Sequence, residues 1–103
     1  MLEELKDKAA RGEIEVSDHA AKQMVRRDIA GAEVLEALAA GQLLENYPEA
    51  PFGPCCLIFG KTGLNRPLHL VVTHPYRPLI RIITVYEPDP TVWSNFITRI
   101  PKP

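Results

Sequence analysis

Apolar residues recur at helical spacing in the first part of the chain. Leu2, Leu5 and Ala9 lie three and four residues apart, and Gly12 follows as a stop, so this pattern predicts a short helix. Residues 13–17 (EIEVS) then alternate between polar and apolar side chains, which is typical of a brief strand.

Two more helices are predicted before residue 42. Ser17 is a good N-cap and Asp18 brings a negative charge to the first turn, so a second helix should begin there and continue to about Asp28. A third helix is expected from about Gly31, and Gly41 supplies its C-cap. Its buried face should hold three apolar residues, Val34, Leu35 and Leu38.

The second half of the chain has the pattern of a sheet. All ten prolines lie at or beyond position 48, which leaves the first half free to be helical and punctuates the second half with turns. Residues 42–47 look extended, and three runs rich in β-forming residues follow at 55–60 (CCLIFG), 68–74 (LHLVVTH) and 79–86 (LIRIITVY). The short linkers between these runs fit hairpin loops, so we expect an antiparallel meander.

The last predicted element is a short C-terminal helix within residues 87–100. Asp89 can cap it and Pro90 suits its first position. Its buried face would consist of Val92, Trp93, Phe96 and Ile97. The complete pattern predicts an α+β fold in a single domain over residues 1–103, with N-terminal helices packed on an antiparallel sheet of about four strands.

Composition indicates the class of protein and the cellular compartment. Hydrophobic residues make up 46% and charged residues 24% of the chain, which is typical of a globular domain rather than a disordered tail. The chain has no apolar signal segment and no run of about 20 apolar residues. The adjacent Cys55 and Cys56 cannot form an ordinary disulfide framework. We therefore expect a cytoplasmic protein with no membrane partner.

The net charge of −1 conceals an asymmetry between the two halves of the chain. Residues 1–50 hold six Lys and Arg against eleven Asp and Glu, a net charge of −5, whereas residues 51–103 hold six against two, a net charge of +4. An anionic partner could meet the basic half, although a soluble surface of mixed charge explains the same numbers.

Polar side chains that can do chemistry collect on the predicted second helix. At ~3.6 residues per turn, His19, Gln23, Arg26 and Arg27 fall along one stripe of its surface. The positive end of the helix dipole would keep His19 neutral, which is the form that a general base needs. In the plainer interpretation, His19 only caps or packs at the helix start and the two arginines are solvated.

The predicted sheet adds further candidates. By strict alternation, Arg81 and Tyr86 should point to opposite faces of the last strand. Tyr86 could position a phosphate or donate to it, or it could be a cross-strand aromatic residue. His69 lies on a central strand, where a histidine is either part of a site or structural. No metal site is predicted, because adjacent strand cysteines point to opposite faces and the chain has no C-x-x-C or H-x-x-x-H pair.

Several of these residues also make up a family pattern. It consists of a Ser-x-His-Ala helix start, an Arg one or two turns later, a V-x-x-A-L helix that ends in Gly, and a closing T-V-Y-x-P strand. The pattern falls on Ser17, His19, Ala20, Arg27, Val34, Ala37, Leu38, Gly41, Thr84, Val85, Tyr86 and Pro88. From about Ile14 to Trp93, the chain resembles the family catalogued as domain of unknown function 4258.

This resemblance implies a function. The layout of helices followed by a sheet is similar to RelE-like, barnase-like and BrnT-like ribonucleases, and family members are frequently encoded beside a small antitoxin-like zinc-ribbon protein. The resemblance thus implies a metal-independent endoribonuclease toxin of a type II toxin–antitoxin pair. Its partners would be RNA and a small antitoxin protein, and it would need no cofactor. One departure is Asp28 and Ala30 where the family often has Gly and Ser, so the third helix lacks a capping hydroxyl.

On this hypothesis the candidate residues take two roles. The predicted catalytic residues are His19 as base or acid, Arg27 for the phosphate charge, and Tyr86. The predicted substrate-binding residues are Arg26, Gln23, His69 and Arg81. The alternatives are a non-catalytic protein-binding module and a degenerate toxin relative that has lost its chemistry. Assembly into a homo-oligomer is left open.

Overall fold

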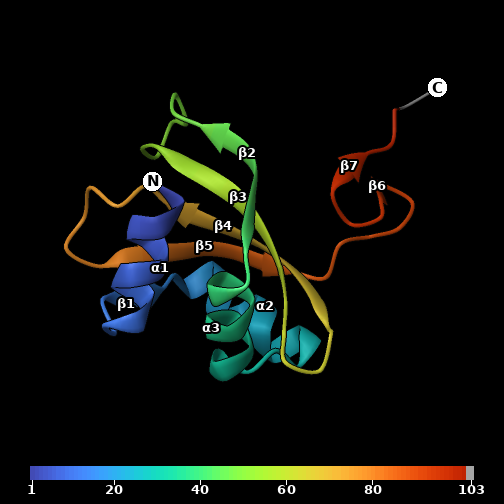
Figure 1. The fold of residues 1–103 in the computed structure, drawn as a ribbon, viewed down its shortest axis with the longest axis horizontal. Coiled ribbons are helices and arrows are strands. Elements are labelled where there is room, and N and C mark those ends of the chain that lie inside the picture. The colour runs from blue at the N-terminus through green and yellow to red at the C-terminus, as the bar shows by residue number, and fades with distance from the viewer. Residues whose placement is uncertain (102–103) are drawn as a thin grey trace.

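The computed structural model describes residues 1–101 (Figure 1). Within these residues the helices are α1 (Leu2–Ala10), α2 (Asp18–Arg27) and α3 (Gly31–Ala39). The strands are β1 (Ile14–Val16), β2 (Gln42–Tyr47), β3 (Cys55–Lys61), β4 (Pro67–Thr73), β5 (Ile80–Tyr86), β6 (Trp93–Ser94) and β7 (Thr98–Arg99). None of the helices in this part of the chain has the length and apolar character needed to cross a bilayer.

Five strands form one mixed sheet in the order β1-β5-β4-β3-β2. Strands β2 to β5 pair antiparallel, as the meander pattern predicts, whereas β1 runs parallel to β5, with Ile14 opposite Ile80. The α+β class and the order of helices before the sheet are thus confirmed, but the sheet has five strands rather than four. A strand of three residues offers too little alternation to reveal a partner that lies near the other end of the chain.

The three helices cover one face of this sheet. Leu5 of α1, Ala20 of α2 and Leu38 of α3 are fully buried in one core cluster with alternate residues of the central strands. The strands contribute Cys56, Ile58, Leu68, Leu70, Val72, Ile80, Ile82 and Val85. Figure 1 shows the helices gathered along one side of the sheet. Because strand residues alternate between faces, the polar residues between these core positions point to the opposite face.

Helix α3 approaches β3 very closely at Gly60. A β-carbon built at this position would lie 1.8 Å from the backbone carbonyl oxygen of Ala37, which no real contact allows. The missing side chain at Gly60 therefore lets the α3 backbone lie directly against the sheet.

The starts of α2 and α3 are held differently. The hydroxyl of Ser17 caps α2 as predicted, because it accepts from the N–H of Ala20 at 3.0 Å and donates to the carbonyl of Ile83 at 3.0 Å. This second bond ties α2 to β5. At the start of α3, Ala30 has no capping oxygen, and only the carboxylate of Glu33 reaches back, to the N–H of Ala30 at 2.9 Å.

Residues 87–100 do not form the predicted C-terminal helix. The carboxylate of Asp89 accepts from the N–H and the hydroxyl of Thr91 at 2.8 and 2.7 Å, which makes a turn, and β6 and β7 then pair as a small hairpin. At the hairpin tip, Asn95 and Phe96 have φ angles of 52° and 68°. Two successive positive φ angles are typical of the turn that joins two hairpin strands.

Packing explains why this segment is not helical. Trp93 is buried, but Val92 and Ile97 are 41% and 40% exposed, so the predicted apolar face does not exist. The segment is also rich in β-branched residues, which lose side-chain freedom in a helix. They are Thr91, Val92, Ile97, Thr98 and Ile100.

Gly60→Ala should lower the free energy of unfolding by about 3 kcal/mol, which is at the upper end of the range for overpacked core sites. The cost is high because the backbone oxygen of Ala37, rather than a flexible side chain, must move. Thermal unfolding will detect this change, since 1 kcal/mol shifts the melting temperature of a domain of this size by about 4–8 °C. Gly63→Ala is the matched control, because its β-carbon would lie 3.6 Å from the nearest atom, Glu36 Oε1. Equal melting temperatures for the two variants would contradict the close approach.

Ala30→Ser should stabilise the protein by about 1 kcal/mol, the usual contribution of an N-cap hydroxyl. The backbone of Ala30 is already extended, with φ −82° and ψ 153°, so a serine hydroxyl can accept from the N–H of Glu33 without rearrangement. Ala32→Ser, inside α3, makes the same chemical change without a cap and should cost up to about 0.5 kcal/mol. Denaturant unfolding measures both variants, and a less stable Ala30→Ser would refute the capping argument.

Candidate functional site

A buried histidine lies at the centre of the sheet face opposite the helices. His69 on β4 is completely buried, while its chain neighbours Leu68 and Leu70 point into the helical core. Three aromatic rings surround the imidazole, and their centroids lie 4.6 Å (Trp93), 5.2 Å (Tyr86) and 5.9 Å (Phe59) from its own. The hairpin that carries Trp93 therefore covers this part of the sheet.

Both ring nitrogens of His69 have partners. Nε2 lies 2.6 Å from the backbone carbonyl oxygen of Phe96, and Nδ1 lies 3.2 Å from the hydroxyl oxygen of Tyr86. Because a carbonyl oxygen can only accept, neutral His69 carries its proton on Nε2 and accepts from the Tyr86 hydroxyl at Nδ1. Burial lowers the pKa of His69 and raises the pKa of Tyr86, since both charged forms would lose hydration.

An ion pair fastens the hairpin to the edge of the sheet. Arg99 on β7 donates from Nε and Nη2 to the two carboxylate oxygens of Glu45 on β2, at 2.7 and 2.9 Å, and Tyr47 donates its hydroxyl to the same carboxylate. The bonds from Arg99, with a smaller effect of Tyr47, lower the pKa of Glu45 to about 2. Burial and the bond to Glu45 raise the pKa of Tyr47 to about 12. The Arg99 guanidinium also lies over the Trp93 ring, 4.6 Å from its centroid.

A pocket of about 350 Å³ opens beside this cluster. It is lined by Arg27, Tyr86, Glu87, Asp89, Val92, Trp93 and Arg99. Arg27 comes from the end of α2, Tyr86 from the end of β5 and Arg99 from the hairpin. The two carboxylates of the lining, Glu87 and Asp89, already bind protein donors at 2.7 and 2.8 Å. Two arginines and a tyrosine thus line one cavity.

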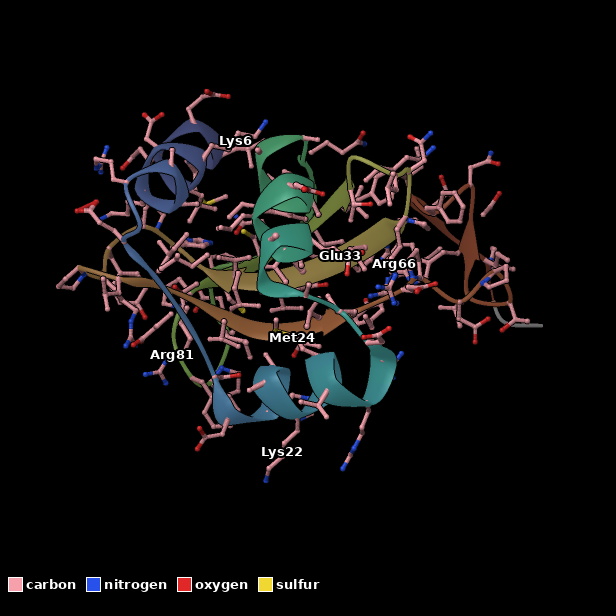
Figure 2. The ribbon with its side chains drawn as sticks, turned by 90° about the horizontal axis from the view of Figure 1, so that it is seen from below. Lys6, Lys22, Met24, Glu33, Arg66 and Arg81 are labelled. Atoms are coloured by element: carbon pink, nitrogen blue, oxygen red, sulfur yellow. The ribbon has the colours of Figure 1, made fainter. Side chains whose placement is uncertain are left out.

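Arg66, in the loop between β3 and β4, holds one wall of this pocket. Its guanidinium donates to the backbone carbonyls of Arg27 and Asp28 at the end of α2, both at 2.7 Å. It also binds Glu33 in the first turn of α3 at 3.1 Å and Glu87 just after β5 at 2.7 Å. Figure 2 shows the side chains of Arg66 and Glu33 next to each other. One side chain therefore sets the distance between the end of α2 and the end of β5.

The prediction that Arg81 and Tyr86 point to opposite faces of β5 is wrong. The pairing of β5 with β4 shifts at Ile83, which is an extra residue in β5, so the strand contains a β-bulge. The core positions on either side of this bulge are three residues apart instead of two. Arg81 and Tyr86 consequently share the face opposite the helices, at the two ends of the strand, and Arg81 donates to Glu15 at 2.9 Å.

The remaining predicted site residues lie away from the pocket. His19 is exposed in the first turn of α2, eight residues before Arg27, which is about 12 Å along the axis at ~1.5 Å per residue. Gln23 accepts from the backbone N–H of Val85 at 2.9 Å, so its amide holds α2 on β5. Arg26 is exposed on the last turn of α2. The structure thus brings Arg27, Tyr86 and the buried His69 together, and it does not bring His19 to them.

The sequence analysis missed two contributors to the site, Arg99 and Arg66, and assigned a third, Trp93, to the wrong element. Arg99 lies 54 residues after its partner Glu45, and Arg66 lies 33 residues after Glu33, so no local spacing connects them. Trp93 was predicted, but as part of a helical face. The one available hint was the surplus of positive charge in residues 51–103, to which both arginines contribute.

Outside the pocket, residues 1–101 contain no cluster that could hold a metal ion, and their two cysteine thiols are buried. In residues 1–101, no three His, Cys, Asp or Glu side chains lie close enough together to hold a metal ion. Cys55 and Cys56 are buried free thiols, and burial raises the pKa of both, that of Cys56 to about 11. Neither thiol is therefore a ready nucleophile at neutral pH.

A match to one protein family covers most of this fold. The family model described as Domain of unknown function (DUF4258) matches residues 16–87. The matched segment includes Arg27, His69 and Tyr86, whereas the C-terminal hairpin with Arg99 lies outside it. No curated protein and no solved structure matches the chain.

Glu45→Gln should loosen the hairpin by an amount that depends on pH. The pKa of Glu45 in the folded protein is about 2, below the ordinary value of 4.5, so its ion pair stabilises the fold fully above pH 4.5 and is lost as the pH falls towards 2. We expect the variant to melt at a lower temperature than the wild type at pH 7. This difference should shrink between pH 4.5 and 2.

The emission of Trp93 provides a direct readout of the hairpin, because it is the only tryptophan and is 5% exposed. Its emission should shift to the red in Glu45→Gln at neutral pH. Glu49→Gln, at an exposed position, is the charge-matched control. A melting difference that stays constant with pH, or that Glu49→Gln reproduces, would contradict this account.

Proposed function

The chain belongs to the family described as Domain of unknown function (DUF4258), and from this premise and the pocket at the end of β5 we propose that it is an endoribonuclease. It would cleave RNA without a metal ion, in the cytoplasm, as the toxin of a type II toxin–antitoxin pair. A small antitoxin protein would be its partner.

The observation that carries this proposal is the meeting of Arg27, Tyr86 and Arg99 in one pocket. Guanidinium groups bind phosphate oxygens through paired, charge-assisted hydrogen bonds. A phenolic hydroxyl beside them can exchange a proton with an oxygen of the RNA. The volume of about 350 Å³ is near the lower end for ligand sites, which suits one phosphodiester linkage within a longer chain.

Cleavage would begin when the 2′-oxygen of the RNA attacks the adjacent phosphorus. The P–O5′ bond then breaks and leaves a 2′,3′-cyclic phosphate and a 5′-hydroxyl. Arg27 and Arg99 would bind the negative charge that builds up on the phosphorane oxygens. Arg99 is preorganised for this role, because Glu45 holds its Nε and Nη2 at 2.7 and 2.9 Å and leaves its other N–H groups for an anion.

The charge of the second half of the sequence also suits an anionic partner. Residues 51–103 carry a net charge of +4, and such an excess contributes to the binding of nucleic acid whatever its sequence. Arg81 lies on the same sheet face as Tyr86, so RNA that extends along β5 would meet it. His19 receives no catalytic role in this proposal, because it lies about 12 Å from Arg27 along α2.

The second candidate is a non-catalytic protein-binding module. Val25 on α2 is 83% exposed, and Val16 and Leu35 are 42% and 44% exposed on the helical side of the molecule. Exposed apolar side chains of this kind often mark contacts with other proteins. This surface lies away from the pocket, so a docking role and a cleavage role can be tested by separate substitutions.

Arg27→Gln and Tyr86→Phe should each reduce RNA cleavage by about 10²-fold or more, because each removes a group that would contact the reacting phosphate or an oxygen bonded to it. The first measurement is growth and total-RNA integrity after induction in a bacterium, where ribosomes are present. The second is cleavage of a defined RNA by purified protein with and without a chelator, followed by analysis of the 3′-end. A 2′,3′-cyclic phosphate formed in the chelator is the expected product.

Lys22→Gln is the matched control for Arg27→Gln, since it removes one positive charge from the same helix at an exposed position that points away from the sheet (Figure 2). It should cleave RNA at the wild-type rate. Intact RNA and normal growth with the wild type would favour the protein-binding module. Loss of cleavage in His19→Ala would instead move the reaction to the first turn of α2.

A further inference from the structure

His69 is a buried titratable group that the reaction outlined above does not use. Its ring is completely buried, and a polar ring loses hydration there that an apolar side chain would not lose. Both nitrogens are nevertheless bonded, one towards the hairpin and one towards the pocket. Tyr86 connects this buried ring with the cavity through a hydrogen bond, because its hydroxyl lies 3.2 Å from Nδ1 and the residue lines the pocket.

The direction of these bonds determines what Tyr86 can do. Because the carbonyl of Phe96 accepts from Nε2 of His69, Nδ1 offers a lone pair and the hydroxyl proton of Tyr86 points inwards to it. The hydroxyl oxygen then has its own lone pairs for the pocket that Tyr86 lines. Tyr86 is thus arranged to accept a proton from a ligand rather than to donate one.

We infer that His69 acts through Tyr86 as a proton relay, in which Tyr86 takes the proton of the RNA 2′-hydroxyl while His69 takes the proton of Tyr86. Tyr86 is then the catalytic residue that touches the RNA, and His69 is a positioning residue behind it. This inference rests on the proposed function and names the proton acceptor in it.

Every proton in this step has a destination. The 2′-oxygen forms its bond to phosphorus, and its proton moves to the oxygen of Tyr86. The original hydroxyl proton of Tyr86 moves to Nδ1, so His69 becomes an imidazolium and Tyr86 stays neutral. As the P–O5′ bond breaks, the departing 5′-oxygen takes a proton from water in the pocket. That water is left as hydroxide, and His69 afterwards returns its extra proton through Tyr86 to this hydroxide.

The groups around His69 fit such a relay. Burial is the largest influence on its pKa and lowers it, so the resting ring is neutral at pH 7 and can accept a proton. The carbonyl of Phe96 and the carboxylate of Glu45 favour the imidazolium, and the guanidinium of Arg99 opposes it. Burial also raises the pKa of Tyr86. A tyrosinate without a proton acceptor would therefore be unfavourable, and Nδ1 supplies the acceptor.

Two substitutions of His69 test its two hydrogen bonds separately. In His69→Gln, the side-chain amide can still donate to the carbonyl of Phe96 from the place of Nε2. In His69→Asn, the amide oxygen can still accept from Tyr86 at the place of Nδ1. Neither amide can take up a proton at neutral pH, so the relay requires both variants to lose about 10²-fold or more in cleavage rate. A merely structural role predicts that His69→Gln, which keeps the hairpin bond, stays active.

Two further readouts report the relay directly. Burial lowers the pKa of His69, and a protonated ring cannot accept, so wild-type cleavage should fall only at a pH below the usual histidine pKa of about 6.5. The residual activity of His69→Gln should lack this fall. Nitrogen NMR of the ring in the protein without RNA should show the proton on Nε2 and an accepting Nδ1. Tyr86→Phe should change the Nδ1 signal and leave the Nε2 signal in place.

The failures of the relay and of the nuclease have different signatures. A wild-type rate in His69→Gln, or a ring with its proton on Nδ1, would overturn the relay while the nuclease stands. RNA that stays intact with folded wild-type protein would overturn the proposed function and the relay with it. The Trp93 emission of each variant verifies that the hairpin is in place, because Trp93 packs on His69 at 4.6 Å.

Discussion

The guanidinium of Arg66 is the interaction on which the arrangement of the site depends. It binds the last carbonyls of α2, the carboxylate of Glu33 in α3 and that of Glu87 after β5. These groups come from three elements that share no local sequence signal. A planar side chain with five N–H donors can hold them at fixed positions at once, which a lysine cannot do. The same bonds also compensate the negative end of the α2 dipole, where Asp28 adopts a left-handed conformation with φ 53°.

The two faces of the sheet bury different kinds of side chain. The helical face buries an almost entirely apolar core, and Gly60 allows α3 to press directly against it. The opposite face buries polar groups, and each of them is bonded, since no buried side-chain polar atom in the part of the chain described here lacks a partner. His69, Tyr86 and Glu45 are held there by rings and by a short hairpin. His69 and Tyr86 therefore lie on strands of the sheet rather than on a loop, whereas Arg27 lies at the end of α2 and Arg99 on the hairpin.

The C-terminal hairpin completes a site that the family segment only begins. The family match ends at residue 87, so Arg27 and Tyr86 belong to the matched segment and Arg99 does not. The hairpin is fastened by the ion pair to Glu45 and by the bond from His69 to the carbonyl of Phe96. Its tip holds two residues with positive φ, neither of them glycine. Stacking of Phe96 on Phe59, with ring centroids 5.9 Å apart, helps to offset the cost of that conformation.

The sequence by itself determined the elements whose signals are local. The three helices, the cap at Ser17, the antiparallel run of strands and the α+β class follow from periodicity, capping and turn residues that lie within a few positions of one another. Only the tertiary structure decided the parallel pairing of β1, the bulge at Ile83, the hairpin in place of a helix, and the meeting of Arg27 with Arg99. Each of these depends on contacts between residues that are distant in the chain, and a side-chain pattern carries no record of which distant residue it will meet. The bulge has the largest consequence, because one extra residue reverses the face of every side chain beyond it and so puts Tyr86 beside His69.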